Sequence, residues 1–379
     1  VALMGQVERA AAGAGVPLEA YLELARGALE NVAAVGPAAA LTGPVARGDD
    51  ATLARHLAAL DVTEREAYEA MVAQARRLLA TAVTPAMYQR EKVAGVAGVV
   101  VVDRIARLRK ELDAARARGE SVGLVPTMGY LHDGHAALIR QARAECDVVV
   151  VTDFVNPLQF GEPADLESYP RDLDHDAAVA TGAGADFLFA PSVDEMYPER
   201  VQTTVRVAGV SEGLEGVSRP GHFDGVATVV AKLFAVAGPC RAYFGEKDFQ
   251  QLAVVRRVVA DLSLPVDVVG CATVREPDGL AMSSRNVRLS PDERRAATVL
   301  HRALAAGAAA LEAGERDPSV IAAVMAAAIA CEPLARLDYA EAVDANDLSV
   351  PDRLSGDVRL LVAARVGTTR LIDNMGVTI

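Results

Sequence analysis

Two histidines three residues apart, His132 and His135, are the side chains best placed in this sequence to do chemistry. They follow the apolar run Val122–Val125 and precede a helical pattern over residues 136–144. The H-x-G-H pattern is therefore expected at a strand-to-helix turn, where free backbone N–H groups and the helix dipole attract phosphate. Gly134 lets the backbone approach a ligand closely. The turn predicts a phosphate-binding site, although four residues alone are a weak signal.

A second candidate, Gly245-Glu246-Lys247-Asp248, follows another apolar run and again opens a helical pattern. Lys247 at such a point can neutralise phosphate, and Asp248 can accept hydrogen bonds from ribose hydroxyls. Taken alone, the segment is better explained as an ordinary helix start with Asp248 as N-cap.

A third candidate, Met282-Ser283-Ser284-Arg285, lies in the polar stretch 275–286, which we expect to be a mobile loop. Its two hydroxyls and guanidinium are donors suited to a triphosphate. A plain surface loop is an equal alternative in isolation. Together with an H-x-G-H turn, however, the loop resembles the second signature of adenylyl-transferring enzymes.

Uncharged polar side chains stand among apolar ones at Asn156 and Gln159, after a further strand pattern. They could fix a small polar acid in a dry pocket, or they could belong to a simple Asn-Pro turn. His222 is as well explained by ordering its turn as by facing a substrate. The other histidines stand in polar helical surroundings and are expected at the solvated surface: His56, His175 and His301.

The composition favours a folded cytoplasmic protein. The chain has 379 residues, of which 51% are hydrophobic and 23% charged, and a net charge of -13, which disfavours nonspecific binding to nucleic acid or to an anionic membrane. The four cysteines form no C-x-x-C pair, so reduced thiols are expected. No apolar stretch reaches membrane-spanning length, and no charged-then-apolar leader opens the sequence. A zinc site is disfavoured because the histidine pair has no nearby cysteine.

Residues 1–95 differ from the rest, with helical periodicity and Gly-Pro punctuation at Gly36-Pro37 and Gly43-Pro44. The phrase from Gly36 to Asp49 resembles the C-terminal helical domain of Rossmann-like proteins related to ketopantoate reductases. Their Rossmann half is absent here, so we expect a packing or oligomerisation role. The expected helices are Gln6–Gly13, Leu18–Ala34, Asp50–Leu60 and Thr63–Leu79.

From about residue 99, short apolar runs alternate with amphipathic helices, which predicts an α/β fold with a parallel sheet covered on both faces. The expected strands are Val122–Pro126, Val148–Asp153, Phe187–Ala190, Arg241–Gly245 and Val266–Cys271. The expected helices are Asp103–Arg118, Gly134–Glu145, Leu173–Gly182, Gly225–Val236 and Phe249–Leu262. We assign residues 98–288 to this Rossmann-like nucleotide-binding domain.

Residues 289–379 are expected to form a smaller α+β lobe. Alanine-rich helical patterns, Pro291–Ala313 and Pro318–Cys331, are followed by two strand-like pieces, Leu337–Val343 and Val358–Val366.

Seven motifs in one order make the pattern specific. They are V-P-T-M-G-Y-L-H-D-G-H, F-V-N-P-L-Q-F-G, Y-P-R-D-L, E-M-Y-P, R-P-G-H-F-D-G-V, F-G-E-K-D-F-Q-Q-L and D-G-L-A-M-S-S-R-N. Over residues 98–379 the chain closely resembles the pantothenate synthetase (pantoate–β-alanine ligase) family. The resemblance implies an H-x-G-H nucleotidyltransferase-type fold, a cytoplasmic homodimer, and condensation of pantoate with β-alanine through pantoyl-adenylate, with ATP and Mg²⁺.

The resemblance also implies roles for particular residues. Gln159 would bind pantoate and β-alanine, Gln251 pantoate, and Asn156 would belong to the same pocket. The catalytic groups would be His135 as proton donor, with His132, Lys247, Ser283, Ser284 and Arg285. The ATP site would comprise Met128, Gly129, Tyr130, Leu131, His132, Asp133, Gly134, His135, Gly245, Glu246, Lys247, Asp248, Val274, Met282, Ser283, Ser284 and Arg285.

One departure and two alternatives stand beside this interpretation. Asp153 occupies a place where the family usually has an apolar residue, and it is expected to be exposed or ion-paired, since an unpaired buried carboxylate is costly. Another adenylyl-transferring enzyme of the H-x-G-H class would share the phosphate machinery without the Gln159 and Gln251 pocket. A non-catalytic scaffold would need neither the phosphate-binding residues nor this pocket.

Overall fold

The computed structural model describes residues 50–60, 65, 68–73, 75, 98–161, 166–167 and 169–379. The chain divides into two compact units, Val1–Gly95 and Val96–Ile379. In the first unit, helix α4 (Asp50–Ala59) confirms the helix expected at Asp50–Leu60. The expectations at Gln6–Gly13 and Leu18–Ala34 lie outside the described residues. The one at Thr63–Leu79 lies partly outside them, and its described residues, 65, 68–73 and 75, are helical as expected.

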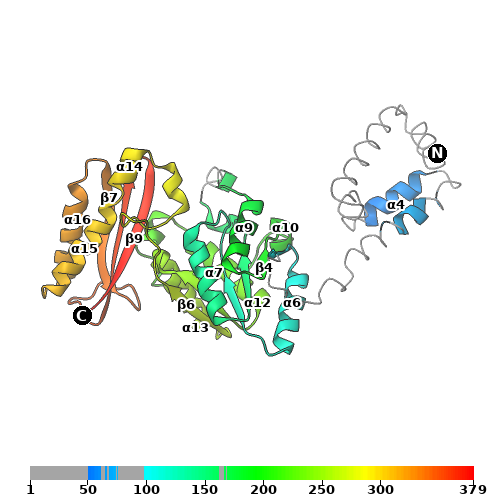
Figure 1. Cartoon of the computed structure of the whole chain (residues 1–379), viewed down its shortest axis with the longest axis horizontal. Helices are drawn as coiled ribbons and strands as arrows, with labels where there is room; N and C mark the ends of the chain where they lie inside the picture. Colours follow the sequence, from blue (N-terminus) through cyan, green and yellow to red (C-terminus); the bar gives the residue numbers. More distant parts are fainter. Residues whose placement is uncertain are drawn as a thin grey trace. The chain divides into compact units, whose positions relative to one another are not determined.

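A six-stranded parallel sheet forms the centre of the second unit, as the alternating pattern predicts (Figure 1). Its strands lie in the order β1-β4-β3-β2-β5-β6. The strands are β1 (Val100–Val102), β2 (Val122–Val125), β3 (Val148–Thr152), β4 (Phe187–Phe189), β5 (Cys240–Gly245) and β6 (Val266–Cys271). The sequence did not predict β1, because three residues are too few to show a period.

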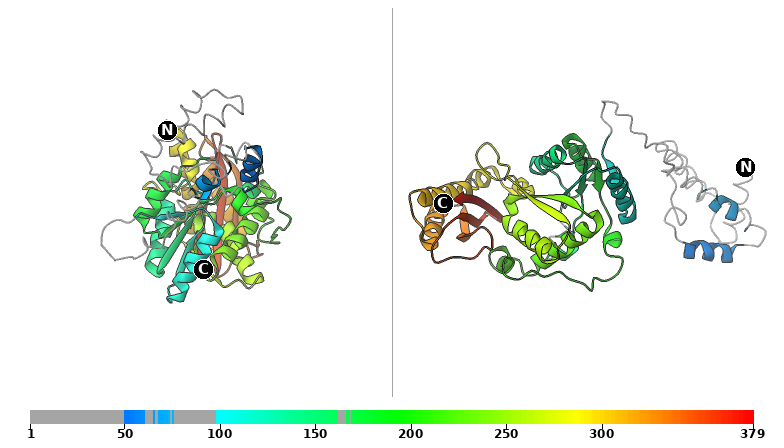
Figure 2. Two further views of the ribbon diagram at one scale, coloured as in Figure 1. Left: turned by 90° about the vertical axis from the view of Figure 1, so that its right-hand side faces the viewer. Right: turned by 90° about the horizontal axis from the view of Figure 1, so that it is seen from below.

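Helices cover both faces of this sheet (Figure 2). On one face, Val149 and Val151 pack in a core with α7 (Asp133–Glu145) and α9 (Leu173–Ala183). Val148 and Val150 point to the opposite core, because successive side chains of a strand face opposite ways. That second core is closed by α6 (Ile105–Ala117), α12 (His222–Ala237) and α13 (Phe249–Asp261).

The C-terminal lobe is an antiparallel sheet, β7-β8-β9, packed against helices. Its strands are β7 (Ala335–Asp344), β8 (Asp357–Val366) and β9 (Thr369–Thr378), and its helices are α14 (Pro291–Ala296), α15 (Val299–Glu312) and α16 (Pro318–Ala330). One expectation was wrong in detail, and one strand was missed. The helix expected over Pro291–Ala313 is interrupted at Ala297-Thr298, and β9 was missed because buried Asp373 and Asn374 break its apolar pattern.

The strand order creates a crevice beyond the carboxyl ends of the neighbouring strands β2 and β5. From β2 the chain proceeds to β3 and β4 on one side, whereas β5 and β6 lie on the other. Loops after the two adjacent strands therefore diverge, and open α/β sheets bind ligands at such a switch point. The short helices at this edge are η2 (Pro157–Gln159), α10 (Val193–Met196), α11 (Glu215–Ser218), η3 (Glu246–Asp248) and η4 (Ser284–Arg288).

Candidate active site

The turn after β2 is held open by side chains beneath it. Gly129 and Tyr130 both have positive φ angles, 79° and 53°, so the backbone reverses sharply before α7. Fully buried Asp176 of α9 accepts hydrogen bonds from the backbone N–H groups of Tyr130 (2.7 Å) and Leu131 (2.6 Å). Thr127 adds a third support, since its hydroxyl accepts a hydrogen bond from the Gly129 N–H at 3.1 Å. The turn is thus positioned by the sheet and by α9 rather than by its own sequence.

The two histidines of the turn cap α7 with their own rings. His132 Nδ1 accepts from the Gly134 N–H at 3.1 Å, and His135 Nδ1 accepts from the His132 N–H at 3.3 Å. A nitrogen that accepts carries no proton, so in each neutral ring the proton must sit on Nε2. Both imidazoles therefore offer an Nε2–H donor, the form suited to phosphate oxygens.

Burial keeps these rings neutral. Burial, followed by the charge of Lys247, lowers the pKa of His132, and burial together with His132 lowers the pKa of His135 to about 3. The ring centroids lie 4.1 Å apart, so two imidazolium charges would repel strongly. Gly134 is required between them, because a Cβ there would lie 2.8 Å from Cε1 of His132. The pair acts as neutral hydrogen-bond donors before any ligand arrives.

The segment after β5 brings a cation to the same crevice. Lys247 and Asp248 form an ion pair with 3.3 Å between Nζ and Oδ1. Loss of hydration in the pocket by itself would raise the pKa of Asp248. The charges of Lys247 and Arg285 outweigh that effect and hold the pKa below its usual range. Asp248 is therefore an anion at neutral pH and can accept hydrogen bonds from hydroxyl groups.

The C-terminal lobe holds this segment in place. The buried amide of Asn374 donates to the backbone carbonyls of Glu246 (2.9 Å) and Lys247 (2.8 Å). Arg359 donates to Asn374 Oδ1 at 2.8 Å and to Glu246 at 2.9 Å, and it lies 3.8 Å from the centroid of the Phe249 ring. Charge-assisted bonds of this kind are stronger than neutral ones, so the lobe fixes the backbone from which Lys247 projects.

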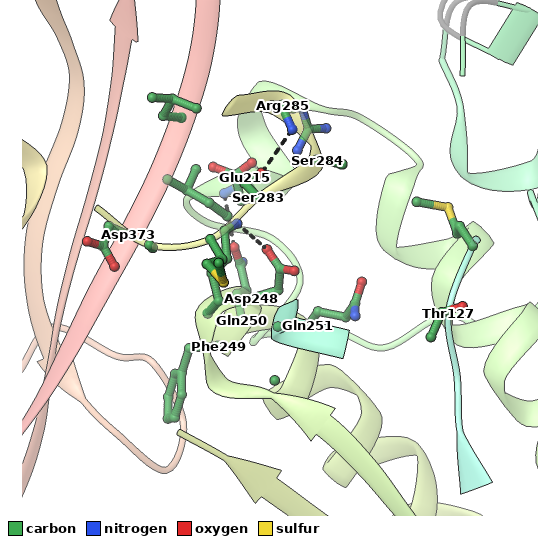
Figure 3. A pocket seen from close by; sticks show the side chains of 18 of the residues that line it. Thr127, Glu215, Asp248, Phe249, Gln250, Gln251, Ser283, Ser284, Arg285 and Asp373 are labelled. Carbon is green, nitrogen blue, oxygen red and sulfur yellow. Dashed lines mark hydrogen bonds and ion pairs between the residues drawn. The ribbon is translucent and has the colours of Figure 1, made fainter. Parts of the chain in front are cut away.

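The 275–286 loop lies across the crevice and is pinned to the same lobe. Arg275 makes a bidentate ion pair with the buried carboxylate of Asp373, at 2.7 and 3.0 Å. The Ser283 hydroxyl caps η4 by accepting from the Arg285 N–H at 3.2 Å. Figure 3 shows the Ser283–Arg285 segment above Asp248, with the Gln251 side chain extending toward Thr127.

The cavity enclosed by these segments has a volume of about 810 Å³, within the range typical of ligand pockets. Its inner wall carries the amides of Asn156, Gln159 and Gln251. Among the described residues, the Gln251 side chain has no hydrogen-bond partner, so its amide is free for a ligand. His222 lies behind Gln159: Nδ1 is 3.0 Å from the Gln159 carbonyl and Nε2 is 3.1 Å from an Arg219 nitrogen.

Most of the residues named from the sequence line this one cavity. They are Met128, Tyr130, His132, Gly134, His135, Asn156, Gln159, Gly245, Lys247, Asp248, Gln251, Val274, Met282, Ser283, Ser284 and Arg285. Four residues of the expected ATP-binding set do not line it: Gly129, Leu131, Asp133 and Glu246. The cavity also has lining residues to which the sequence gave no role. Thr127, Tyr169 and Arg219 stand in the quoted motifs, whereas Asn374 stands in none of them.

The remaining histidines differ from one another. Burial, with the charge of Arg219, lowers the pKa of His222 to about 4, and both of its ring nitrogens have partners, so it orders the wall behind Gln159. His175 is exposed, yet its Nε2 is 2.9 Å from the Leu131 carbonyl. His301 is half-buried against Gly279, and its buried Nδ1 has no hydrogen-bond partner among the described residues. The expectation of a solvated surface residue was therefore wrong for His301.

Asp153 is half-buried and forms no ion pair with any residue that the structure describes, so the expectation of an exposed or ion-paired carboxylate was wrong. Its side chain lies under the turn, close enough that a Cβ on Gly129 would be within 2.1 Å of Oδ1, and it forms a hydrogen bond with Asp176. Burial and the neighbouring Asp176 raise the pKa of Asp153 to about 6. Two carboxyl groups can hydrogen-bond only when one is protonated. Below about pH 6 the pair therefore shares one proton.

The fold and the cavity define an α/β protein of the H-x-G-H type, in which neutral and cationic donors surround a space suited to phosphates. Comparison with known proteins identifies the family. A family model described as pantoate-beta-alanine ligase matches residues 100–376. The chain therefore belongs to the pantoate–β-alanine ligase family, and it is an ATP-dependent ligase. Residues 1–75 match a separate model, described as a domain of unknown function, DUF2520.

Individual relatives agree with this assignment. The chain is 57% identical over 269 residues to the pantothenate synthetase of Deinococcus radiodurans, covering 69% of this chain and 95% of the relative. It is 51% identical over 275 residues to that of Moorella thermoacetica, covering 73% and 97%.

Solved structures lead to the same family. Pantothenate synthetase from Thermus thermophilus superposes with a TM-score of 0.69 at 50% identity, covering 73% of this chain and 99% of that one. The pantoate-beta-alanine ligase of Francisella tularensis, solved with beta-gamma ATP and beta-alanine, has a TM-score of 0.61 at 32% identity, with coverages of 73% and 97%.

Proposed function

We propose that the cavity joins pantoate to β-alanine in two steps. A pantoate carboxylate oxygen attacks the α-phosphorus of ATP, and the bond to pyrophosphate breaks, giving pantoyl-adenylate. The β-alanine amine then attacks the acyl carbon, the bond to AMP breaks, and the amine loses a proton, giving pantothenate. The observation that carries this proposal is that phosphate donors from three segments and the free amide of Gln251 meet in one cavity.

The phosphate work is assigned to preplaced donors. His132 and His135 would donate from Nε2, Lys247 and Arg285 would supply positive charge, and the hydroxyls of Ser283 and Ser284 would complete the set. Donors that are already oriented stabilise developing charge without reorganisation. With its low pKa, His135 serves as a hydrogen-bond donor rather than as an imidazolium acid before ATP binds.

The acid pocket is assigned to the amides. Gln251 would bind pantoate with its free amide, and Gln159 would bind pantoate and lie beside β-alanine. The loop over residues 275–286 would cover the adenylate and exclude water, because water would hydrolyse the mixed anhydride.

Mg²⁺ fits this site as an ion brought in with the nucleotide. The phosphate-facing side chains are neutral or cationic, and no group of three or more His, Cys, Asp or Glu residues in the described parts of the chain could hold a metal. Mg²⁺ would be held chiefly by phosphate oxygens, where it would offset charge on the leaving pyrophosphate.

The test of this function is pantoate-dependent exchange of pyrophosphate into ATP. We expect exchange with pantoate and none with a nucleotide or pantetheine acceptor, which another H-x-G-H adenylyltransferase would use. His135→Ala should lower single-turnover adenylate formation at least about 100-fold, the scale seen when one transition-state donor is removed. A near-normal rate in this variant would contradict the role given to His135.

The rest of the chain and the setting are proposed more briefly. In the described parts, no helix is long and apolar enough to cross a membrane. We assign the enzyme to the cytoplasm and expect a homodimer, with residues 1–95 serving packing or oligomerisation. Deleting residues 1–95 and measuring both activity and mass in solution tests this. Activity should persist, and any change should be in the number of chains per particle, calculated from the mass.

A further inference from the structure

Asn156 lines the inner wall of the cavity, yet its side chain has no hydrogen-bonding capacity to spare for a substrate. It is 1% exposed. Its Oδ1 accepts from the Leu158 N–H at 3.3 Å and from the Tyr197 hydroxyl at 3.0 Å. Its Nδ2 donates to the Gly225 carbonyl and to Gln159 Oε1, both at 3.1 Å. An amide has two acceptor sites and two donors, and all four are used.

Backbone groups decide which end of this amide is which. A backbone N–H, that of Leu158, can only donate, and a backbone carbonyl, that of Gly225, can only accept. If the oxygen and nitrogen of Asn156 were exchanged, its amide N–H would face the Leu158 N–H and its oxygen would face the Gly225 carbonyl, and both contacts would be repulsive. The close approach that makes this possible requires glycine, because a Cβ at residue 225 would lie 2.3 Å from the Leu158 carbonyl oxygen. The orientation of Asn156 is therefore dictated by the fold.

That orientation is passed on to Gln159. Because Asn156 presents an N–H, Gln159 must turn its Oε1 toward Asn156. Its Nε2 is then directed at the Met128 sulfur, at 2.7 Å, on the cavity wall. One N–H of this group is left to donate to a ligand. Gln159 is thereby set as a donor, which matches the carboxylate and hydroxyl oxygens of a hydroxy acid.

Tyr197 is the outermost member of this series of hydrogen bonds, which runs from Tyr197 through Asn156 to Gln159. It belongs to the E-M-Y-P motif, to which the proposed mechanism gives no role, and it does not line the cavity. Burial raises the pKa of Tyr197 to about 12, so its hydroxyl remains a donor over the working range. The ring is held by Phe154, at 6.0 Å between centroids, and by Lys232, whose Nζ lies 5.1 Å from the ring centroid.

We infer that Tyr197 and Asn156 are positioning residues that set the donor face of Gln159 toward pantoate, and that Asn156 makes no contact with substrate. This inference rests on the proposed function, which places pantoate against Gln159. It predicts that changes at Tyr197 or Asn156 act on pantoate through Gln159 alone, and leave the ATP site, formed by other segments, unaffected.

The test is a pair of double-mutant cycles. Tyr197→Phe should raise the KM for pantoate about threefold to tenfold, the equivalent of one neutral hydrogen bond, with the KM for ATP unchanged. Asn156→Ala should raise it further. In a Gln159→Ala background, neither change should weaken pantoate binding again, because residues that act through one group are not additive. Pyrophosphate exchange at varied pantoate and at varied ATP supplies both constants.

Tyr243→Phe is the matched control. Tyr243 is fully buried and its hydroxyl also has partners, Glu145 and Cys146, but it lies in the other core, away from the cavity. We expect it to lose stability without a change in either KM.

The outcomes separate the two proposals. If Asn156→Ala multiplies the defect of Gln159→Ala, Asn156 contacts the substrate and the inference is overturned. The inference is also overturned if Tyr197→Phe alters the KM for ATP as well as the KM for pantoate. Tyr243→Phe should alter neither. If instead Gln159→Ala itself leaves pantoate binding intact, the proposed pantoate pocket fails, whatever the cycles show.

Discussion

Replacing Asp153 by Asn should stabilise the protein at neutral pH and leave its stability unchanged in acid. The reason is the carboxyl pair beneath the H-x-G-H turn, in which burial and Asp176 raise the pKa of Asp153 from 3.8 to about 6. The folded protein thus holds a proton that the unfolded chain releases near pH ~4. The contribution of Asp153 to stability is therefore largest below pH ~4, falls as the pH rises toward ~6, and is constant above that.

The magnitude follows from the size of the shift. Two pH units at about 1.4 kcal/mol each correspond to ~3 kcal/mol. Since Asp153 is only partly buried beside an open cavity, solvent screening reduces this to about 1–2 kcal/mol. Asp153→Asn keeps the shape and supplies a permanent N–H donor to Asp176. The variant should therefore exceed the wild type by this amount at pH 7.5 and equal it near pH 4.

The assay is urea unfolding followed by circular dichroism, repeated between pH 4 and pH 8 on both proteins. Asp147→Asn is a control of opposite sign: the N–H and hydroxyl of Ser121 lower the pKa of Asp147, so this variant should lose stability above pH ~4. A difference between wild type and Asp153→Asn that does not vary with pH, or that grows in acid, would refute the shared proton.

Two further predictions concern the phosphate side of the cavity. Gly134→Ala should reduce adenylate formation at least about tenfold in single turnovers, because the new Cβ displaces the His132 ring. Gly182→Ala is the control, because its Cβ meets nothing within 4 Å, and its rate should be near that of the wild type. Equal rates in the two variants would contradict the packing argument. Asn374→Ala should slow adenylate formation about tenfold with the KM for pantoate unchanged, since it releases the backbone of Lys247. The exposed Asn346→Ala is its control, and a pantoate-specific effect of Asn374→Ala would show that the lobe acts elsewhere.

The chemistry was largely evident from the sequence. His132, His135 and Lys247 were predicted from residue type and from their place after apolar runs. The Met282–Arg285 segment was predicted from its hydroxyls and guanidinium in a polar loop, and the structure brings all of them to one cavity. This worked because strand and helix periods are local, and because the carboxyl ends of parallel strands share one edge of a sheet. The ordered motifs then indicated the family.

What the sequence by itself determined, then, was which side chains stand at the ends of strands. Tertiary structure alone decided how they are oriented. The proton positions on the two imidazoles follow from backbone N–H groups at the start of α7. The donor face of Gln159 follows from Gly225, which fixes Asn156 from 69 positions further along the chain. The placement of Lys247 depends on Asn374, in a strand that the sequence did not reveal. Hydrogen-bond direction depends on partners brought together by folding, so no local pattern could have carried it.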